Sequence, residues 1–246
     1  MDLAQLIYSI KEASNEKLRS EEIFRFIGFC LTHAHQSESQ NYQDVWALWE
    51  SGRHSLIPDF YFVEFGATNG KTSSNTYMLE KNYQWKGIVA EPNPFWHEDL
   101  YKNRSCSIDT RCVFSETGQT LEFLMTDIAD LSTIKGFGTG DEFKAEREKS
   151  KTITVETVSL LDLLNTHNAP PVINYMSVDT EGSEYGILNS FFMQNEGKYD
   201  VKALTVEHNY TMRDKIHEMM TANGYKRKFT EISRWDDFYV KEYKNV

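Results

Sequence analysis

The sequence has few cysteines, no long apolar run and no basic leader. Its 246 residues include only three cysteines, without the spacing of a disulfide framework or a zinc site. We therefore expect small, buried or idle thiols in a reducing compartment. No stretch approaches the ~18 apolar residues that a membrane helix needs, and the chain starts without a signal-peptide pattern. These absences predict a cytoplasmic, soluble protein with no membrane span.

Positive charge is also scarce. The chain has 26 Lys and Arg against 37 Asp and Glu, which gives a formal net charge of −11. This balance repels phosphate backbones, so no nucleic acid is expected as a partner. The longest basic run, residues 226–228, is short and is better explained as a solvated edge strand. The length suits one α/β domain with additions.

A further absence concerns glycine. The stretch Tyr61–Tyr77 contains Glu64-x-Gly66-x-x-x-Gly70 and lacks the Gly-x-Gly-x-x-Gly signature of dinucleotide sites. Apolar neighbours of Glu64 indicate a short buried strand, and the two glycines allow a sharp turn close to a ligand. The missing glycine and the acid argue against a pyrophosphate. They favour a ligand with one nucleoside and a charged amino-acid tail, namely S-adenosylmethionine (SAM).

A second expected strand, Lys86–Glu91, ends in an acid. At this place in nucleotide-binding α/β folds, a carboxylate accepts hydrogen bonds from a ribose diol. A simpler interpretation is that Gly66 and Gly70 only make a tight turn. Glu91 and the motifs farther along the chain favour the ligand site.

From Tyr61 onward, strand and helix patterns alternate, which predicts a mostly parallel sheet covered by helices on both faces. The expected strands are 61–66, 86–91, 111–114, 173–179 and 201–207, with a short extra one at 121–125. The expected helices between them are 75–82, 95–103 and 184–193. At the end, a helix over 211–223 precedes two strands, 225–232 and 236–243, which predict a terminal hairpin.

Residues 1–55 have a helical pattern, so we divide the chain into a helical extension (1–55) that packs on the core and a SAM-binding domain (56–246). A lid, a packing cap or a dimer surface would each fit the extension. We favour the packing cap, and a homo-oligomer is left open.

The motifs together resemble FkbM-type SAM-dependent methyltransferases. The resemblance rests on Phe62–Gly70, Ser74–Thr76, Leu79-Glu80, Trp85–Ile88 and Glu91–Asn93, and later on Val158–Asp162 and Ser177–Glu184. It implies a class I methyltransferase fold, which is Rossmann-like, with a mostly parallel seven-stranded sheet and an antiparallel C-terminal hairpin. It also implies methyl transfer to an oxygen, often on a sugar.

The resemblance leads us to expect a SAM-dependent O-methyltransferase acting on a sugar hydroxyl of a glycan or a nucleotide-linked sugar. Two other functions compete with it. Glu91 would also suit the ribose of a nicotinamide cofactor in an oxidoreductase, although the missing glycine signature opposes this. A non-catalytic scaffold that retains the fold is the other alternative, because a fold alone does not prove activity.

Ligands of such sheets bind beyond the carboxyl ends of the strands, so the candidate residues follow each strand. The candidates for cofactor binding are Glu64, Gly66, Ala67, Thr68, Asn69, Gly70, Ser74, Asn75, Glu91, Pro92, Val113 and Phe114. Glu64 is expected to reach the SAM amino group directly or through water, and Val113 and Phe114 to pack on adenine. The simpler alternatives are a Glu64 paired with a backbone amide, an Asn75 that caps a helix, and ordinary core packing.

Acids gather after the fourth and fifth expected strands. Asp179, Glu181 and His208 are the catalytic candidates, and Asp179, Glu207 and His208 are candidate ligands of Mg²⁺ or Mn²⁺. A metal would lower the pKa of the acceptor hydroxyl, whereas without one Asp179 or His208 would take the proton. In a third interpretation the acids are structural, with Glu181 and Glu184 capping the next helix.

The segment Thr133–Gly140 holds three glycines before a charged helix expected over 141–150. A glycine-rich loop before a helix can bind phosphate, but this one lacks the Lys-Ser/Thr of a P-loop. We interpret it as a flap beside the acceptor pocket.

Overall fold

The structure is a computed structural model that describes residues 21–52, 60–126, 131–137, 147, 149–208 and 211–243. Two sequence predictions fall outside these residues. They are the first helix of the extension, which the apolar spacing from Leu3 to Ile10 predicts, and nearly all of the charged helix expected over 141–150. Within the described residues, every helix is too short or too polar to cross a membrane.

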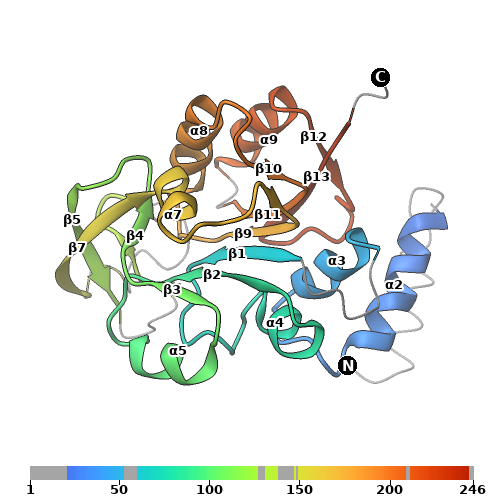
Figure 1. Ribbon diagram of the computed structural model, residues 1–246, viewed down its shortest axis with the longest axis horizontal. Helices are drawn as coiled ribbons and strands as arrows, with labels where there is room; N and C mark the ends of the chain where they lie inside the picture. Colours follow the sequence, from blue (N-terminus) through green and yellow to red (C-terminus); the bar gives the residue numbers. More distant parts are fainter. Residues whose placement is uncertain are drawn as a thin grey trace.

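The centre of the molecule is a seven-stranded sheet in the order β12-β13-β11-β9-β1-β2-β3 (Figure 1). Its strands are β1 (Tyr61–Phe65), β2 (Lys86–Ala90), β3 (Ser107–Asp109), β9 (Tyr175–Val178), β11 (Ala203–Glu207), β12 (Tyr225–Lys228) and β13 (Asp236–Lys241). The first five strands in chain order pair in parallel, and β13 runs antiparallel to β11 and β12. This order confirms the class I methyltransferase fold with its terminal antiparallel hairpin.

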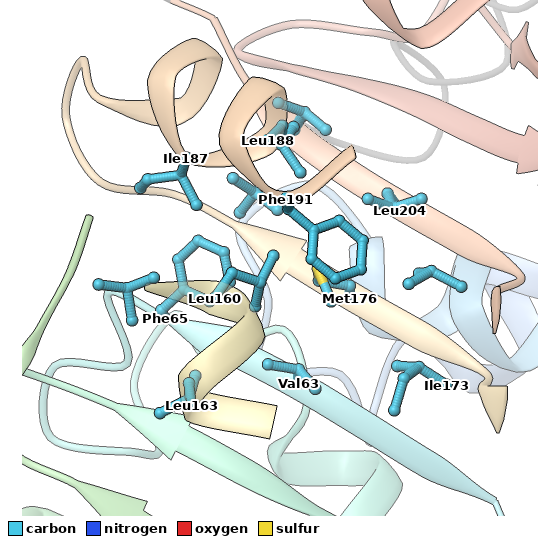
Figure 2. Close-up of a cluster of buried hydrophobic side chains, with 14 of the residues drawn as sticks. Val63, Phe65, Leu160, Leu163, Ile173, Met176, Ile187, Leu188, Phe191 and Leu204 are labelled. Carbon is cyan, nitrogen blue, oxygen red and sulfur yellow. The ribbon is translucent and has the colours of Figure 1, made fainter. Parts of the chain in front are cut away.

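Helices cover both faces of the sheet (Figure 1). On one face lie α7 (Leu160–Thr166), α8 (Glu184–Gln194) and α9 (Arg213–Ala222), and on the other α3 (Gln43–Glu50), α4 (Tyr77–Tyr83) and α5 (His97–Asn103), with α2 (Glu21–His33) packed on α3. Side chains alternate along β1. Val63 and Phe65 therefore join the core beneath α7 and α8 (Figure 2), whereas Phe62 joins the opposite core.

A second, smaller sheet stands beside the first, in the order β4-β7-β5-β6. Its strands are β4 (Cys112–Phe114), β5 (Thr120–Met125), β6 (Thr133–Ile134) and β7 (Lys151–Ser159). The expectation that 111–114 is the third strand of the main sheet is therefore wrong, because β3 takes that place. The Asp109 carboxylate binds the backbone N and guanidinium of Arg111, and this turn leads the chain out of the main sheet.

Two further boundaries differ from expectation. The strand predicted over 173–179 is split into β8 (Val172–Ile173) and β9, and the next one into β10 (Asp200–Val201) and β11. The start of the expected flap, Thr133 and Ile134, is strand β6, with side chains only 1% and 5% exposed. Its glycines beyond Phe137 lie outside the described residues.

The helical extension shares a core with the sheet. Trp46 and Leu48 of α3 are fully buried, and the Trp46 ring makes edge contacts with Tyr175 (centroids 6.3 Å apart) and Phe238 (5.1 Å). These rings come from β9 and β13, so α3 closes the face of the sheet on which it lies.

Truncation of this helix tests whether it belongs to the cooperative fold. Leu48→Ala should lower the free energy of unfolding by about 2–5 kcal/mol, because it opens a cavity in a packed core. The matched control is Leu31→Ala on α2, where the leucine is 61% exposed and the expected change is within about 0.5 kcal/mol. Urea denaturation measures both. Equal, small changes would show that α3 is not part of the cooperative unit.

Candidate functional site

A cavity of about 650 Å³ lies at the carboxyl ends of β1, β2, β9 and β11, within the usual size range of ligand sites. The predicted residues that line it are Gly66, Ala67, Thr68, Ser74, Asn75, Glu91, Pro92, Val113, Asp179, Glu181, Glu207 and His208. The predicted residues that do not line it are Glu64, Asn69, Gly70 and Phe114.

Glu64 holds the loop that follows β1. Its carboxylate is buried and accepts hydrogen bonds from Ser74 Oγ (2.9 Å), Asn75 backbone N (2.6 Å) and Thr76 Oγ1 (2.5 Å). Arg104 Nη1 lies 3.1 Å from its Oε2. Strand alternation turns this side chain away from the cavity, toward α4 and α5. The structure therefore corrects the expectation of a direct contact with the SAM amino group. Pairing with a backbone amide, the simpler alternative, is what the structure contains.

Gly66 is required for packing between two strand ends. Its φ is +80°, and a Cβ there would overlap the backbone carbonyl oxygen of Asp179. A side chain at position 66 would therefore meet the backbone of Asp179 first.

Three other residues that were predicted to bind the cofactor contact other parts of the protein instead of lining the cavity. A Cβ on Gly70 would stand 2.6 Å from side-chain atoms of Arg104 and Leu100. The Asn69 Oδ1 accepts hydrogen bonds from the backbone at Lys71 and Thr72, and the Phe114 ring faces Phe137. The prediction that Phe114 packs on adenine is therefore corrected, because β4 lies in the second sheet. Of the predicted pair, only Val113 faces the cavity.

Glu91 is fixed at the end of β2. Its two carboxylate oxygens accept hydrogen bonds from the backbone N of Thr68 (2.9 Å) and of Asn93 (2.7 Å). Glu91 thereby joins the loop after β1 to the loop after β2 and presents its carboxylate to the cavity. A carboxylate so placed suits a ribose diol.

Asn75 is a polar group turned to the same cavity. It is 5% exposed, and its amide nitrogen donates to Ser177 Oγ at 2.9 Å. In the described part of the chain no donor reaches its Oδ1. A buried acceptor without a donor is costly, and this oxygen is enclosed by the protein rather than open to the cavity.

Acids gather where β9 and β11 end. Carboxylate oxygens of Asp179, Glu181 and Glu207 lie within 4.8 Å of one another. Arg147 Nη2 offsets one of these charges, 2.7 Å from Glu181 Oε2. The set differs from the predicted metal ligands, because Glu181 takes the place expected for His208.

His208 turns toward a separate group of charges. Its Nε2 lies 3.9 Å from Asp237 Oδ1, and Asp237 also pairs with Arg213 and Arg227. Burial lowers the pKa of His208, and the two guanidinium groups lower it further against the pull of Asp237. The imidazole is therefore neutral at pH 7 and remains able to accept a proton.

Crowding changes the acidity of the cluster. Burial raises the pKa of Asp179 well above its usual range, and nearby carboxylates, Glu181 foremost, raise it further. Burial and then the charge of Asp179 raise the pKa of Glu207 in the same way. Two such close carboxyl groups cannot easily both ionise, so we expect the pair to hold a proton near neutrality.

Sequence reasoning missed the wall of the cavity opposite the cofactor loops. Gln40, Gln43, Trp235 and Asp236 line it, and Gln43 Nε2 donates to Asp236 Oδ2 at 2.8 Å. Burial raises the pKa of Asp236 to about 6 although that hydrogen bond lowers it. Asp236 begins an antiparallel strand at the edge where parallel strands end, so topology could have revealed it. No signal in the sequence indicated Gln43.

The sheet order, the terminal hairpin and the cavity at the strand ends define a class I methyltransferase. Residues 64–227 match the family model described as Methyltransferase FkbM domain, which is more than half of the chain. The chain therefore belongs to the FkbM methyltransferase family, and it is a SAM-dependent methyltransferase. No curated protein sequence is detectably similar to it.

Solved structures with a similar arrangement include three methyltransferases. One is methyltransferase FkbM from Methylobacillus flagellatus KT, with 13% identity, a TM-score of 0.44, and coverage of 89% of this chain and 60% of that one. Another is precorrin-6y C5,15-methyltransferase from Geobacter metallireducens GS-15, with 10% identity, a TM-score of 0.41, and coverage of 80% of this chain and 86% of that one. The third is the human methyltransferase 10 domain containing protein, with 9% identity, a TM-score of 0.41, and coverage of 83% of each chain.

Gly66 gives a direct test of the loop. Gly66→Ala should destabilise the fold and weaken SAM binding together, because the new methyl group would displace the chain at Asp179. Gly118→Ala is the control, since Gly118 has φ +81° with no atom within 4 Å of an added Cβ. This control should lower the free energy of unfolding only by the strain of a left-handed alanine, about 1–2 kcal/mol, and it should keep SAM binding. Thermal unfolding and titration calorimetry measure the two effects, and equal losses in both variants would contradict the packing argument.

Proposed function

We propose that this methyltransferase methylates a hydroxyl oxygen of a sugar or a similar polyol. The observation that carries the proposal is the single cavity with Glu91 at one end and the paired acids Asp179 and Glu207 at the other. The first suits a ribose diol, and the second suits removal of a hydroxyl proton. Trp235 supports a sugar, because an indole that is 37% exposed on the cavity wall can stack on a sugar face.

The residues present fit SAM. Glu91 would accept hydrogen bonds from the ribose hydroxyls of SAM. The backbone of Ala67 and Thr68 would lie beside its amino-acid tail. When bound, SAM supplies an electrophilic methyl group on a sulfonium sulfur.

The protein's own part of the reaction is to orient the acceptor and to take its proton. Asp179 lies directly beyond β9, beside the loop of Gly66. Its raised pKa makes its carboxylate, or that of Glu207, a stronger base than an ordinary aspartate. We assign the proton transfer to this pair, and His208 is the second base within the cavity wall.

A divalent cation is a second way to activate the hydroxyl. The oxygens of Asp179, Glu181 and Glu207 have a spacing that would allow Mg²⁺ or Mn²⁺ to bind. The Arg147 guanidinium on Glu181 opposes this, because it already neutralises one of the three ligands. We therefore favour the direct base.

We also propose that the protein works in a reducing compartment such as the cytoplasm. Cys30, Cys106 and Cys112 are free thiols. Burial raises the pKa of each to about 12, which keeps them protonated and unreactive.

Ligand binding tests the cofactor assignment. SAM and S-adenosylhomocysteine should bind with micromolar dissociation constants, about −8 kcal/mol, and NAD should bind far more weakly. Glu91→Gln should weaken SAM binding by about 1–3 kcal/mol, because the amide accepts fewer hydrogen bonds. Glu98→Gln, on the exposed face of α5, is the charge-matched control and should leave it unchanged. Titration calorimetry decides, and tighter binding of NAD than of SAM would refute the assignment.

Chelation and pH separate the two modes of proton removal. We expect transfer of labelled methyl groups from SAM to a sugar panel to survive a chelator. The rate should rise with pH as the Asp179–Glu207 pair loses its proton, because only the ionised form is a base. Asp179→Asn should lower turnover by about 10²–10⁴-fold and keep S-adenosylhomocysteine binding.

Other outcomes have clear meanings. Activity that vanishes with the chelator and returns with Mg²⁺ or Mn²⁺ would replace the direct base with a metal on these acids. Full methyl transfer by both Asp179→Asn and His208→Ala would show that the cluster is structural.

A further inference from the structure

Two neighbouring acids at the start of β13 have opposite surroundings. Asp237 is 1% exposed and lies 2.7 Å from Arg213 Nη2 and 3.1 Å from Arg227 Nη1. Asp236 is 4% exposed, points to the other face of the strand and lines the cavity. In the described part of the chain, its side-chain partner is the neutral amide of Gln43, and no Lys or Arg pairs with it.

A buried, ionised carboxylate is unfavourable when no cation compensates its charge. The amide of Gln43 is itself held in place, because its Oε1 accepts a hydrogen bond from Asn41 N at 2.8 Å. It orients Asp236 but brings no charge. The rest of the described cavity wall supplies none either, since it contains four acids and no Lys or Arg.

The cofactor does not account for this charge. Its ribose and amino-acid ends are assigned to Glu91 and to the backbone of Ala67 and Thr68, on the loops that follow β2 and β1. Asp236 begins β13, which is three strands from β1 in the order β1-β9-β11-β13. With strands about 4.8 Å apart, that is about 14 Å across the sheet. The second ligand of the reaction, the acceptor, occupies this side.

We propose that the acceptor carries a protonated amine near its methylated hydroxyl, and that Asp236, oriented by Gln43, is the residue that selects it. The inference rests on the proposed function, because it takes the cavity as the site of methyl transfer to a hydroxyl. Acceptors with a phosphate or carboxylate at this position are excluded by the same acids, including the nucleotide-linked sugars that the sequence left open.

The experiment compares three matched sugars on the full chain saturated with S-adenosylhomocysteine. Glucosamine, glucose and glucose 6-phosphate present a cation, a neutral group and an anion on one ring, and a chelator keeps metal ions off the acids. We expect glucosamine to bind at least about tenfold more tightly than glucose, as one charge-assisted hydrogen bond allows. Glucose 6-phosphate should bind most weakly.

Substitution then tests the residue. Asp236→Asn should abolish the preference for glucosamine over glucose, whereas Glu98→Gln, which removes a distant surface charge, should keep the preference. Equal or weaker binding of glucosamine by the wild-type protein would overturn the proposal, as would no binding of it at all. A preference that survives Asp236→Asn would overturn the role of that residue. The order of the wild-type protein's affinities for the three sugars tests whether the acceptor carries an amine, even if the variant does not fold.

The order of measurement separates this proposal from the one on which it rests. Binding of S-adenosylhomocysteine is measured first, and its absence would refute the proposed function. Binding of S-adenosylhomocysteine without a preference for the amine would refute only the further inference.

Discussion

The buried ion pair of Glu64 with Arg104 is the interaction on which the cofactor side of the molecule depends. Glu64 is the fourth of the five residues of β1, and Arg104 is the residue that ends α5. Between them they bind Ser74, Thr76 and the carbonyl of Gly70, so the whole loop after β1 is closed around one charge pair. A pair this deeply buried costs desolvation and is maintained only with all its hydrogen bonds made.

A second constraint acts at the ends of β9, β11 and β13. Parallel strands that end at one edge, with an antiparallel strand that begins there, bring Asp179, Glu207 and Asp236 together. Glu207 and Asp236 are register partners, so the sheet itself enforces their proximity. The pKa values of these three carboxyl groups are raised, and Arg147 offsets the charge of the neighbouring Glu181. Raised pKa values of this kind are typical of functional sites.

Much of the fold could be predicted from sequence because it follows from local patterns. Apolar runs with glycine boundaries located β1 and β2, and the absence of a helix between the last two strands located the hairpin. Glu91 could be placed because a strand end fixes it. Glu64 was misassigned because a motif gives the residue but not the face of the strand to which it points. The strand at 111–114 was assigned to the wrong sheet because Arg111 binds Asp109, a contact that periodicity does not reveal.

The acceptor side could not be predicted for a different physical reason. Gln43 and Asp236 are 193 positions apart in the chain, and neither belongs to a motif. They meet only because α3 covers the face of the sheet near β13, which depends on the burial of Trp46 against Tyr175 and Phe238. The cofactor loops thus come from the βα units at the start of the domain, and the opposite wall comes from the two ends of the chain. Substitutions in that wall can change the acceptor while leaving the Glu64–Arg104 loop, and with it the SAM site, intact.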